Sequence, residues 1–175
     1  PWTAAHWQGK RPIAVRYPRA SIPEDKLPER EPRRLEIGKA EQLRAGGDVA
    51  IVAFGTMVLP SMAAAELLAA QGISATVVNA RFAAPLDDAM IGGLARSTGR
   101  IVTVEENVLA GGFGSAVGEM LARAGIVVPR LALGVPDEFV LHGKRDELLQ
   151  QVGLDAEGIA KRTAEFVRQA RQQYV

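Results

Sequence analysis

The feature that most restricts the fold is an alternation, after residue 48, between short apolar runs and longer segments with helical character. The apolar runs are rich in β-branched residues and predict strands, and the segments between them predict helices. Such an alternation indicates βαβ units, so we predict an α/β fold of three layers, with helices on both faces of a mainly parallel sheet. The predicted strands are 49–54, 75–78, 101–105 and 130–133, and the predicted helices are 57–71, 87–97, 114–124, 144–152 and 155–174.

Two further strands are predicted before this alternation. Residues 35–41 alternate between apolar and polar side chains, which suits an antiparallel edge strand. Residues 13–17 predict a strand that stops at Pro18, because proline cannot donate to a sheet ladder. The prolines and dense charges between them indicate a linker. We therefore divide the chain into a separate segment with its own strand at 1–20, a linker at 21–35 and one domain at 36–175.

Composition narrows the possible functions. The 21 basic and 20 acidic residues nearly balance, so the chain has no broad positive electrostatic field that would bind nucleic acid or an anionic membrane surface. Cysteine is absent, which excludes thiol catalysis and disulfides, and His6 and His142 are too far apart for a spaced metal motif. No apolar run approaches the roughly 20 residues that span a bilayer. The first residue is Pro1 rather than methionine, which we interpret as a cut inside a longer polypeptide.

Two motifs follow the strand at 101–105. Gly112, Gly114 and Gly118 lie in a turn before a helix, where phosphate can bind, but their spacing differs from the dinucleotide fingerprint. We favour close helix packing or a subunit contact over nucleotide binding. Glu105 and Glu106 close the strand, and adjacent strand residues point to opposite faces. A shared acid–base role is therefore not expected, and we predict that one side chain caps loop amides or contacts an arginine.

Three further positions are weaker candidates. Thr56, after the strand at 49–54, is interpreted as a helix cap, with ligand binding as the alternative. His142 lies in a polar loop and could titrate near neutral pH, but no nucleophile accompanies it, so a surface or interface role is favoured. His6 lies between two tryptophans, where a packed or hydrogen-bonded histidine is favoured over one that lines a cavity.

Arg16 and Arg19 form the most suggestive pair. On a strand, Arg16 points away from the face of its neighbours Val15 and Tyr17, and a guanidinium in an apolar run requires an anion or a carboxylate. Together with Arg19, beyond Pro18, it suits a phosphate or carboxylate site. Surface or interface salt bridges are the alternative.

Six segments, taken in order, resemble the carboxy-terminal third of the 1-deoxy-D-xylulose-5-phosphate synthase family. The last of them separates this family from transketolases and from the β subunits of 2-oxoacid dehydrogenases, which share the domain type. Ala20 stands where the family has a glycine after the second arginine. This difference affects the turn into the linker and not the guanidinium groups of Arg16 and Arg19. The segments are Ala14–Arg19, Ile37–Lys39, Ala50–Thr56, Asn79–Phe82 with Pro85–Asp87, Thr103–Asn107 with Gly111–Ser115, and Gly134–Asp137 with His142–Gly143.

The resemblance implies a thiamine-diphosphate- and magnesium-dependent transferase of three α/β domains. It condenses pyruvate with D-glyceraldehyde 3-phosphate, with loss of carbon dioxide, for isoprenoid and thiamine biosynthesis. The first two domains bind both cofactors and perform the chemistry. Residues 1–20 would be the last strand of the second, pyrimidine-binding domain. Residues 36–175 would be the transketolase-type C-terminal domain, which covers the site and forms dimers.

In this family the arginine that matches Arg16 is implicated in binding the phosphate of the aldehyde acceptor, with the one that matches Arg19 nearby. The resemblance thus predicts substrate-binding residues here, but no catalytic, cofactor-binding or metal-binding residue, and no activity for the chain alone. It also implies a homodimer in the cytoplasm. The alternatives are the matching domain of a transketolase or 2-oxoacid dehydrogenase relative, or a free-standing nucleotide-binding or interaction domain.

Overall fold

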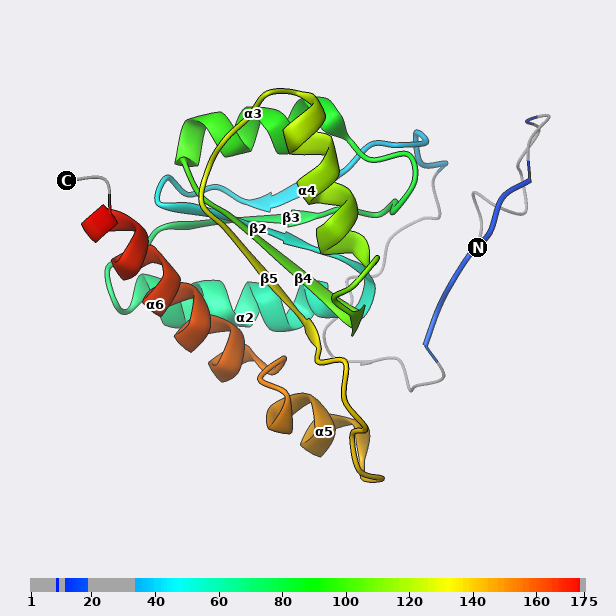
Figure 1. The fold of residues 1–175 in the computed structure, drawn as a ribbon, viewed down its shortest axis with the longest axis vertical. Helices are drawn as coiled ribbons and strands as arrows, with labels where there is room; N and C mark the ends of the chain where they lie inside the picture. Colours follow the sequence, from blue (N-terminus) through cyan, green and yellow to red (C-terminus); the bar gives the residue numbers. More distant parts are fainter. Residues whose placement is uncertain (1–8, 10–11, 19–33, 174–175) are drawn as a thin grey trace. The chain divides into compact units, whose positions relative to one another are not determined.

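A computed structural model describes residues 9, 12–18 and 34–173 of the chain (Figure 1). The chain divides into two compact units, Pro1–Ile37 and Gly38–Val175. All helices and strands of the described residues belong to the second unit, which is the subject of the following paragraphs.

The second unit is built on a five-stranded sheet with the order β1-β3-β2-β4-β5. Four of the strands run parallel, whereas β1 pairs with β3 in the antiparallel direction. The prediction of a mainly parallel sheet with one antiparallel edge strand is therefore confirmed. The strands are β1 (Glu41–Arg44), β2 (Val49–Ala53), β3 (Ala75–Asn79), β4 (Ile101–Val108) and β5 (Arg130–Val135).

Helices cover both faces of this sheet, which confirms the three-layer α/β arrangement (Figure 1). One face packs against α2 (Val58–Ala69) and α6 (Ala156–Gln173). The other packs against α3 (Asp88–Thr98) and α4 (Phe113–Arg123). A single 3-10 turn, η1 (Gly55–Met57), precedes α2, and the short α5 (Arg145–Gln151) precedes α6.

The central strand β2 is apolar at every position because both of its faces are covered. It lies between β3 and β4, and all five of its residues are buried. Val49, Ile51 and Ala53 pack into the core beneath α2 and α6, whereas Ala50 and Val52 pack into the core beneath α3 and α4. Successive residues of a strand point to opposite faces, so a strand between two helical layers must be apolar throughout.

The antiparallel edge strand lies later in the chain than the sequence predicts. The predicted strand is 35–41, but β1 begins at Glu41, and residues 37–38 form a turn instead. Gly38 has a φ of 75°, a left-handed conformation that interrupts a strand. The alternating pattern therefore gave the right kind of element at the wrong position.

Asp87 is the N-cap residue of α3, at the position where the helix predicted at 87–97 begins. Its Oδ1 accepts a hydrogen bond from the Met90 amide at 3.0 Å, as an N-cap residue does. Its Oδ2 accepts another from the Ala40 amide at 3.1 Å. One buried carboxylate thus caps a helix and also fixes the segment that leads into β1.

Residues 12–18 are exposed and form no regular element, so the strand predicted at 13–17 is not present in this chain by itself. A strand requires a neighbour with which to exchange backbone hydrogen bonds, and all five described strands belong to the sheet of the second unit. Most of the predicted linker, residues 19–33, lies outside the described residues. The assignment of residues 1–20 to a neighbouring domain stays a prediction.

Candidate functional site

The carboxyl ends of β2 and β4 lie where the connections of the sheet change direction. The chain leaves β2 for a helix on one face and leaves β4 for a helix on the other (Figure 1). Ligands of open α/β sheets usually bind between two such strand ends. The candidate site is therefore built from the residues that directly follow these two strands.

Glu105 occupies the position in which a phosphate would bind. It is only 1% exposed, although it carries a carboxylate, because both of its oxygens have backbone partners. Oε2 accepts from the Phe113 amide at 2.7 Å, and Oε1 accepts from the Gly114 amide at 2.8 Å. These amides begin α4, where the helix dipole favours an anion. The side chain of Glu105 thus supplies the anion that a nucleotide would otherwise bring.

Gly112 and Gly114 are required by close packing around Glu105. A Cβ atom on Gly112 would lie 2.4 Å from Glu105 Oε2, and one on Gly114 would lie 2.7 Å from Thr103 Oγ1. On Gly118 it would meet a guanidinium nitrogen of Arg130, the end of an exposed and flexible side chain that can move aside, so the packing does not require this glycine. This arrangement bears out the packing interpretation of the glycine-rich turn and leaves no free amides at Phe113 and Gly114 for a dinucleotide phosphate.

Glu106 connects three segments at the carboxyl edge. The Thr56 hydroxyl donates to it, and Arg145 donates through Nε, at 2.9 Å, and through Nη2. The hydrogen bond with Glu106 raises the pKa of Arg145. Thr56 does not cap a helix as predicted, because its hydroxyl is used for this contact. The expectation that one glutamate would cap amides or contact an arginine is confirmed: Glu105 caps amides, and Glu106 contacts Arg145.

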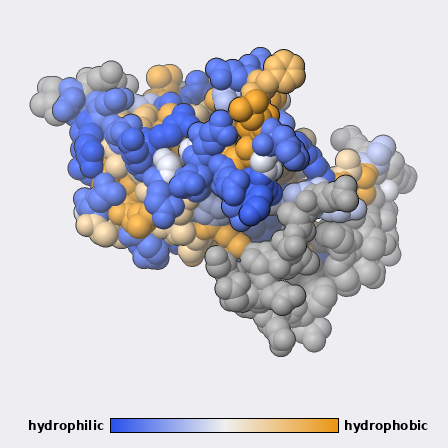
Figure 2. All heavy atoms as spheres, turned by 90° about the horizontal axis from the view of Figure 1, so that it is seen from below, coloured by the Kyte–Doolittle hydropathy of each residue, from blue (hydrophilic) through white to orange (hydrophobic). Residues whose placement is uncertain are grey.

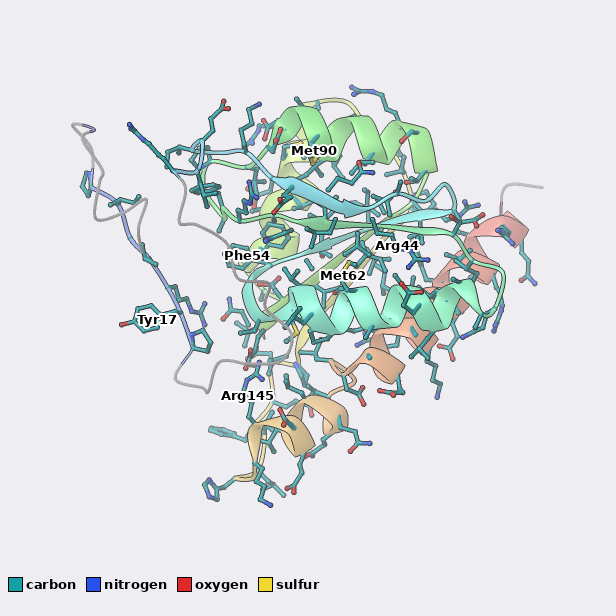
Figure 3. All side chains as sticks on the ribbon, turned by 180° about the vertical axis from the view of Figure 1, so that it is seen from behind. Tyr17, Arg44, Phe54, Met62, Met90 and Arg145 are labelled. Atoms are coloured by element: carbon teal, nitrogen blue, oxygen red, sulfur yellow. The ribbon has the colours of Figure 1, made fainter. Side chains whose placement is uncertain are left out.

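A stacked pair of aromatic rings lies in the same region. The rings of Phe54, after β2, and Phe113, at the start of α4, are stacked with their centroids 5.1 Å apart. Figure 3 shows Phe54 and Arg145 toward the same end of the sheet. The rings belong to the core beneath α3 and α4. The Thr56–Glu106–Arg145 contacts, which we call the Glu106 latch, lie at the same strand ends. The side chains that follow β2 and β4 are thus used in contacts with one another and with Arg145.

Arg81 is a candidate that sequence reasoning missed. It follows β3 at the carboxyl edge with a φ of 58°, and it is the one non-glycine residue with positive φ among those described. Its guanidinium forms an ion pair with Glu41. Non-glycine residues in this conformation concentrate at functional sites. The sequence carries one signal for Arg81, its place in Asn79–Phe82, a segment that resembles the synthase family. Its positive φ could not be predicted, because an arginine in a sequence does not reveal its backbone conformation.

Only some of the sequence-predicted site residues lie in the part of the chain that the structure describes. Arg16 is exposed in the first unit, and Arg19 and His6 lie outside the described residues. His142 is exposed in the loop between β5 and α5. The roles predicted for Arg16 and Arg19 therefore stay predictions.

The described residues contain neither a metal cluster nor a membrane-spanning helix. They contain no group of three or more histidines, aspartates and glutamates arranged to hold a metal ion. No helix in that part of the chain combines the length and the apolar character needed to cross a membrane.

Comparison with known proteins identifies the domain. Residues 38–159 match the family described as transketolase, C-terminal domain. The chain belongs to this family. The chain is 55% identical, over 157 residues, to the 1-deoxy-D-xylulose-5-phosphate synthase of Thermomicrobium roseum, with 89% of this chain and 25% of that protein covered. The protein of the same name from Gloeobacter violaceus is 56% identical over 152 residues, which cover 87% and 24% of the two chains. The chain therefore spans about a quarter of the length of these relatives.

Solved structures agree with this assignment. A split-gene transketolase, described as an inactive β4 tetramer, superposes with a TM-score of 0.71 at 37% identity. The superposed region covers 79% of this chain and 44% of the transketolase chain. A transketolase from Pichia stipitis superposes with a TM-score of 0.54 at 22% identity, covering 77% of this chain and 19% of its own, and shows the fold alone.

Proposed function

We propose that this chain is the carboxy-terminal part of a 1-deoxy-D-xylulose-5-phosphate synthase. The observation that carries the proposal is the 55% identity to the Thermomicrobium roseum protein of that name, spread over 89% of this chain. The complete enzyme would condense pyruvate and D-glyceraldehyde 3-phosphate, release carbon dioxide, and provide a precursor of isoprenoids and thiamine.

Thiamine diphosphate, held by magnesium, supplies the carbanion for this reaction, and the described residues do not fit it. At the helix start where a diphosphate could bind, the amides already bind the Glu105 carboxylate. The described residues also contain no group of three or more histidines, aspartates and glutamates that could hold magnesium. This arrangement supports binding of both cofactors by parts of the enzyme outside this chain, and a covering role for residues 36–175.

Arg16 is the residue through which the chain would contact substrate. It lies between Val15 and Tyr17, and all three side chains are exposed. A guanidinium can bind two phosphate oxygens at once, which suits the phosphate of glyceraldehyde 3-phosphate. We place Arg19 next to the same phosphate.

We further propose a homodimer of the complete enzyme, in the cytoplasm, where pyruvate and glyceraldehyde 3-phosphate are produced. The related split-gene transketolase chain is described as a β4 tetramer, which supports self-association of chains of this type. Its description as inactive also supports our expectation that the present chain has no activity without the remaining domains.

The main test compares the 175-residue chain with the complete enzyme. Both are assayed with pyruvate, glyceraldehyde 3-phosphate, thiamine diphosphate and magnesium. We expect product only from the complete enzyme, and turnover by the 175-residue chain alone would refute the proposal. A parallel assay with transketolase substrates addresses the competing identity, since efficient ketol transfer without decarboxylation would assign the chain to a transketolase instead.

The role of Arg16 is tested with Arg16→Ala in the complete enzyme. Loss of a charge-assisted contact to phosphate should raise the KM for glyceraldehyde 3-phosphate by roughly tenfold or more and leave the KM for pyruvate nearly unchanged. Arg123→Ala, which removes an exposed arginine from α4, is the matched control. Equal effects on both substrates would contradict a phosphate-binding role.

A further inference from the structure

The loop formed by residues 136–144, between β5 and α5, carries the most exposed large apolar side chains of the second unit other than Val127. Phe139 is 106% exposed and Leu141 is 76% exposed. The face drawn in Figure 2 is mainly hydrophilic, with a hydrophobic group that projects beyond it. Exposed apolar side chains that stand together on a projecting loop indicate a contact site rather than random surface.

Both ends of this loop are fixed to the domain. It begins directly after Val135 of β5, which pairs with Val108 of β4. It ends at Arg145, which is held by the Glu106 latch at the start of α5. Near that end Gly143 lies against Leu148, since a Cβ on this glycine would be 3.1 Å from the leucine side chain. The apolar tip is therefore presented from a fixed base.

The tip of the loop, Phe139 and Leu141, follows the carboxyl end of β5. Val127 precedes the amino end of the same strand, at the opposite end of the sheet. Val127 precedes β5 and is 92% exposed, so it offers an isolated apolar side chain for comparison. At the carboxyl end the contact would adjoin the Glu106 latch, which holds Arg145 directly after the loop. Single exposed apolar residues such as Val127 are ordinary on a protein surface.

We propose that Phe139 and Leu141 anchor this domain by inserting into an apolar pocket on the part of the complete enzyme that lies outside this chain. This inference rests on the proposed function. The relatives extend well beyond the matched region, which is only 25% of the Thermomicrobium roseum protein, so ample chain is available to form such a pocket.

The size of the tip favours this partner over a second copy of the chain. An aromatic side chain buries about 150–250 Å², whereas an interface that holds separate molecules together needs about 800 Å² on each side. Two side chains are too few for separate molecules to associate. They suffice when both surfaces belong to one polypeptide, because the covalent connection supplies a high effective concentration.

Site-specific labelling tests the proposal. The chain contains no cysteine, so Phe139→Cys, Leu141→Cys and Val127→Cys each introduce one thiol into it. Each variant is made in the 175-residue chain and in the complete enzyme, and the rate of maleimide labelling at that site is measured by peptide mass spectrometry. We expect positions 139 and 141 to be labelled at least about tenfold more slowly in the complete enzyme, because docking must open before the thiol reacts. The labelling rate at position 127 should differ by less than about twofold between the two forms.

A second measurement needs no substitution and remains valid if the cysteine variants disturb docking. Amide hydrogen exchange in residues 136–144 should be slower in the complete enzyme than in the 175-residue chain. Equal exchange in both forms would overturn the proposal. Protection in the 175-residue chain that increases with its concentration would also overturn it, because the partner would then be a second copy. The result is separable from the proposed function: protection in an enzyme without synthase activity would refute that function and leave the docking contact standing.

Discussion

Carboxylates fasten the sheet at both of its ends, but their surroundings differ. At the carboxyl end Glu105 is 1% exposed and binds the amides that begin α4. At the amino end the side chain of Asp48 is 29% exposed, and it accepts from the Ser74 amide at 2.8 Å and from Arg171 at 2.6 Å. Water can replace the partners of Asp48 but not those of Glu105. Burial, rather than the number of partners, should therefore decide how much each carboxylate contributes to stability.

Glu105→Ala should produce the largest effect. It leaves two buried amide donors without an acceptor and opens space beside them, so we expect the free energy of unfolding to fall by about 2–4 kcal/mol. The measurement is urea unfolding of the 175-residue chain. Glu119→Ala, on the exposed side of α4, is the matched control and should change stability by less than about 0.5 kcal/mol. Equal losses for the two variants would remove the basis of the comparison.

A pair of glycine substitutions tests the packing around Glu105, because one should lower the stability of the chain and the other should raise it. In Gly112→Ala the new Cβ would lie 2.4 Å from Glu105 Oε2 and 2.5 Å from the Val108 carbonyl oxygen, so a loss of about 1–3 kcal/mol is expected. In Gly93→Ala, within α3, nothing lies within 4 Å, and higher helix propensity should stabilise the chain by up to about 1 kcal/mol. Thermal unfolding of both variants is the measurement, and shifts of the same sign would contradict this account.

The fold was predictable because its signals are local and repeated. Every residue of β2 is buried, so its uninterrupted apolar run could be recognised without knowledge of its neighbours. The position of β1 was not predictable to the same degree, since the alternation at 35–41 is weak and the left-handed conformation of Gly38 became visible only in the structure. Local pattern thus identified the kind of element more reliably than its limits.

The candidate site was less predictable because its contacts are distant in sequence. Strand alternation correctly indicated that Glu105 and Glu106 point to opposite faces. No local pattern connects Glu106 with Arg145, which is 39 positions away. Phe139 is visibly apolar in the sequence, but whether a loop side chain folds back or projects depends on the tertiary structure. Exposure and partner choice were therefore left open.

Breaking the Glu106 latch should have a smaller effect than Glu105→Ala, because its side chains are partly exposed. The exposed fractions are 36% for Arg145 and 28% for Glu106, so we expect Arg145→Ala to reduce stability by at most about 1 kcal/mol. Its main effect should be local, with faster amide hydrogen exchange in residues 136–144. Lys144→Ala, at the adjacent and more exposed position, is the control and should leave exchange unchanged. Unaltered exchange in Arg145→Ala would mean that the latch does not hold the loop.

The smallest effect is expected from Asp48 at the amino end, and it should depend on pH. The hydrogen bond from the Ser74 amide lowers the pKa of Asp48 below its usual 3.8, and Arg171 and Arg100 act in the same direction. A carboxyl group with a lowered pKa in the folded state binds fewer protons than in the unfolded state, so its contribution is fully present well above pH 3.8 and is lost as the pH falls through the lowered pKa. Asp48→Asn should therefore destabilise the chain by less than about 1 kcal/mol at pH 7, with a difference from wild type that shrinks below about pH 5. Urea unfolding at a series of pH values measures this difference. A difference that stays constant down to pH values well below 3.8 would show that the charge of Asp48 does not fasten this end of the sheet.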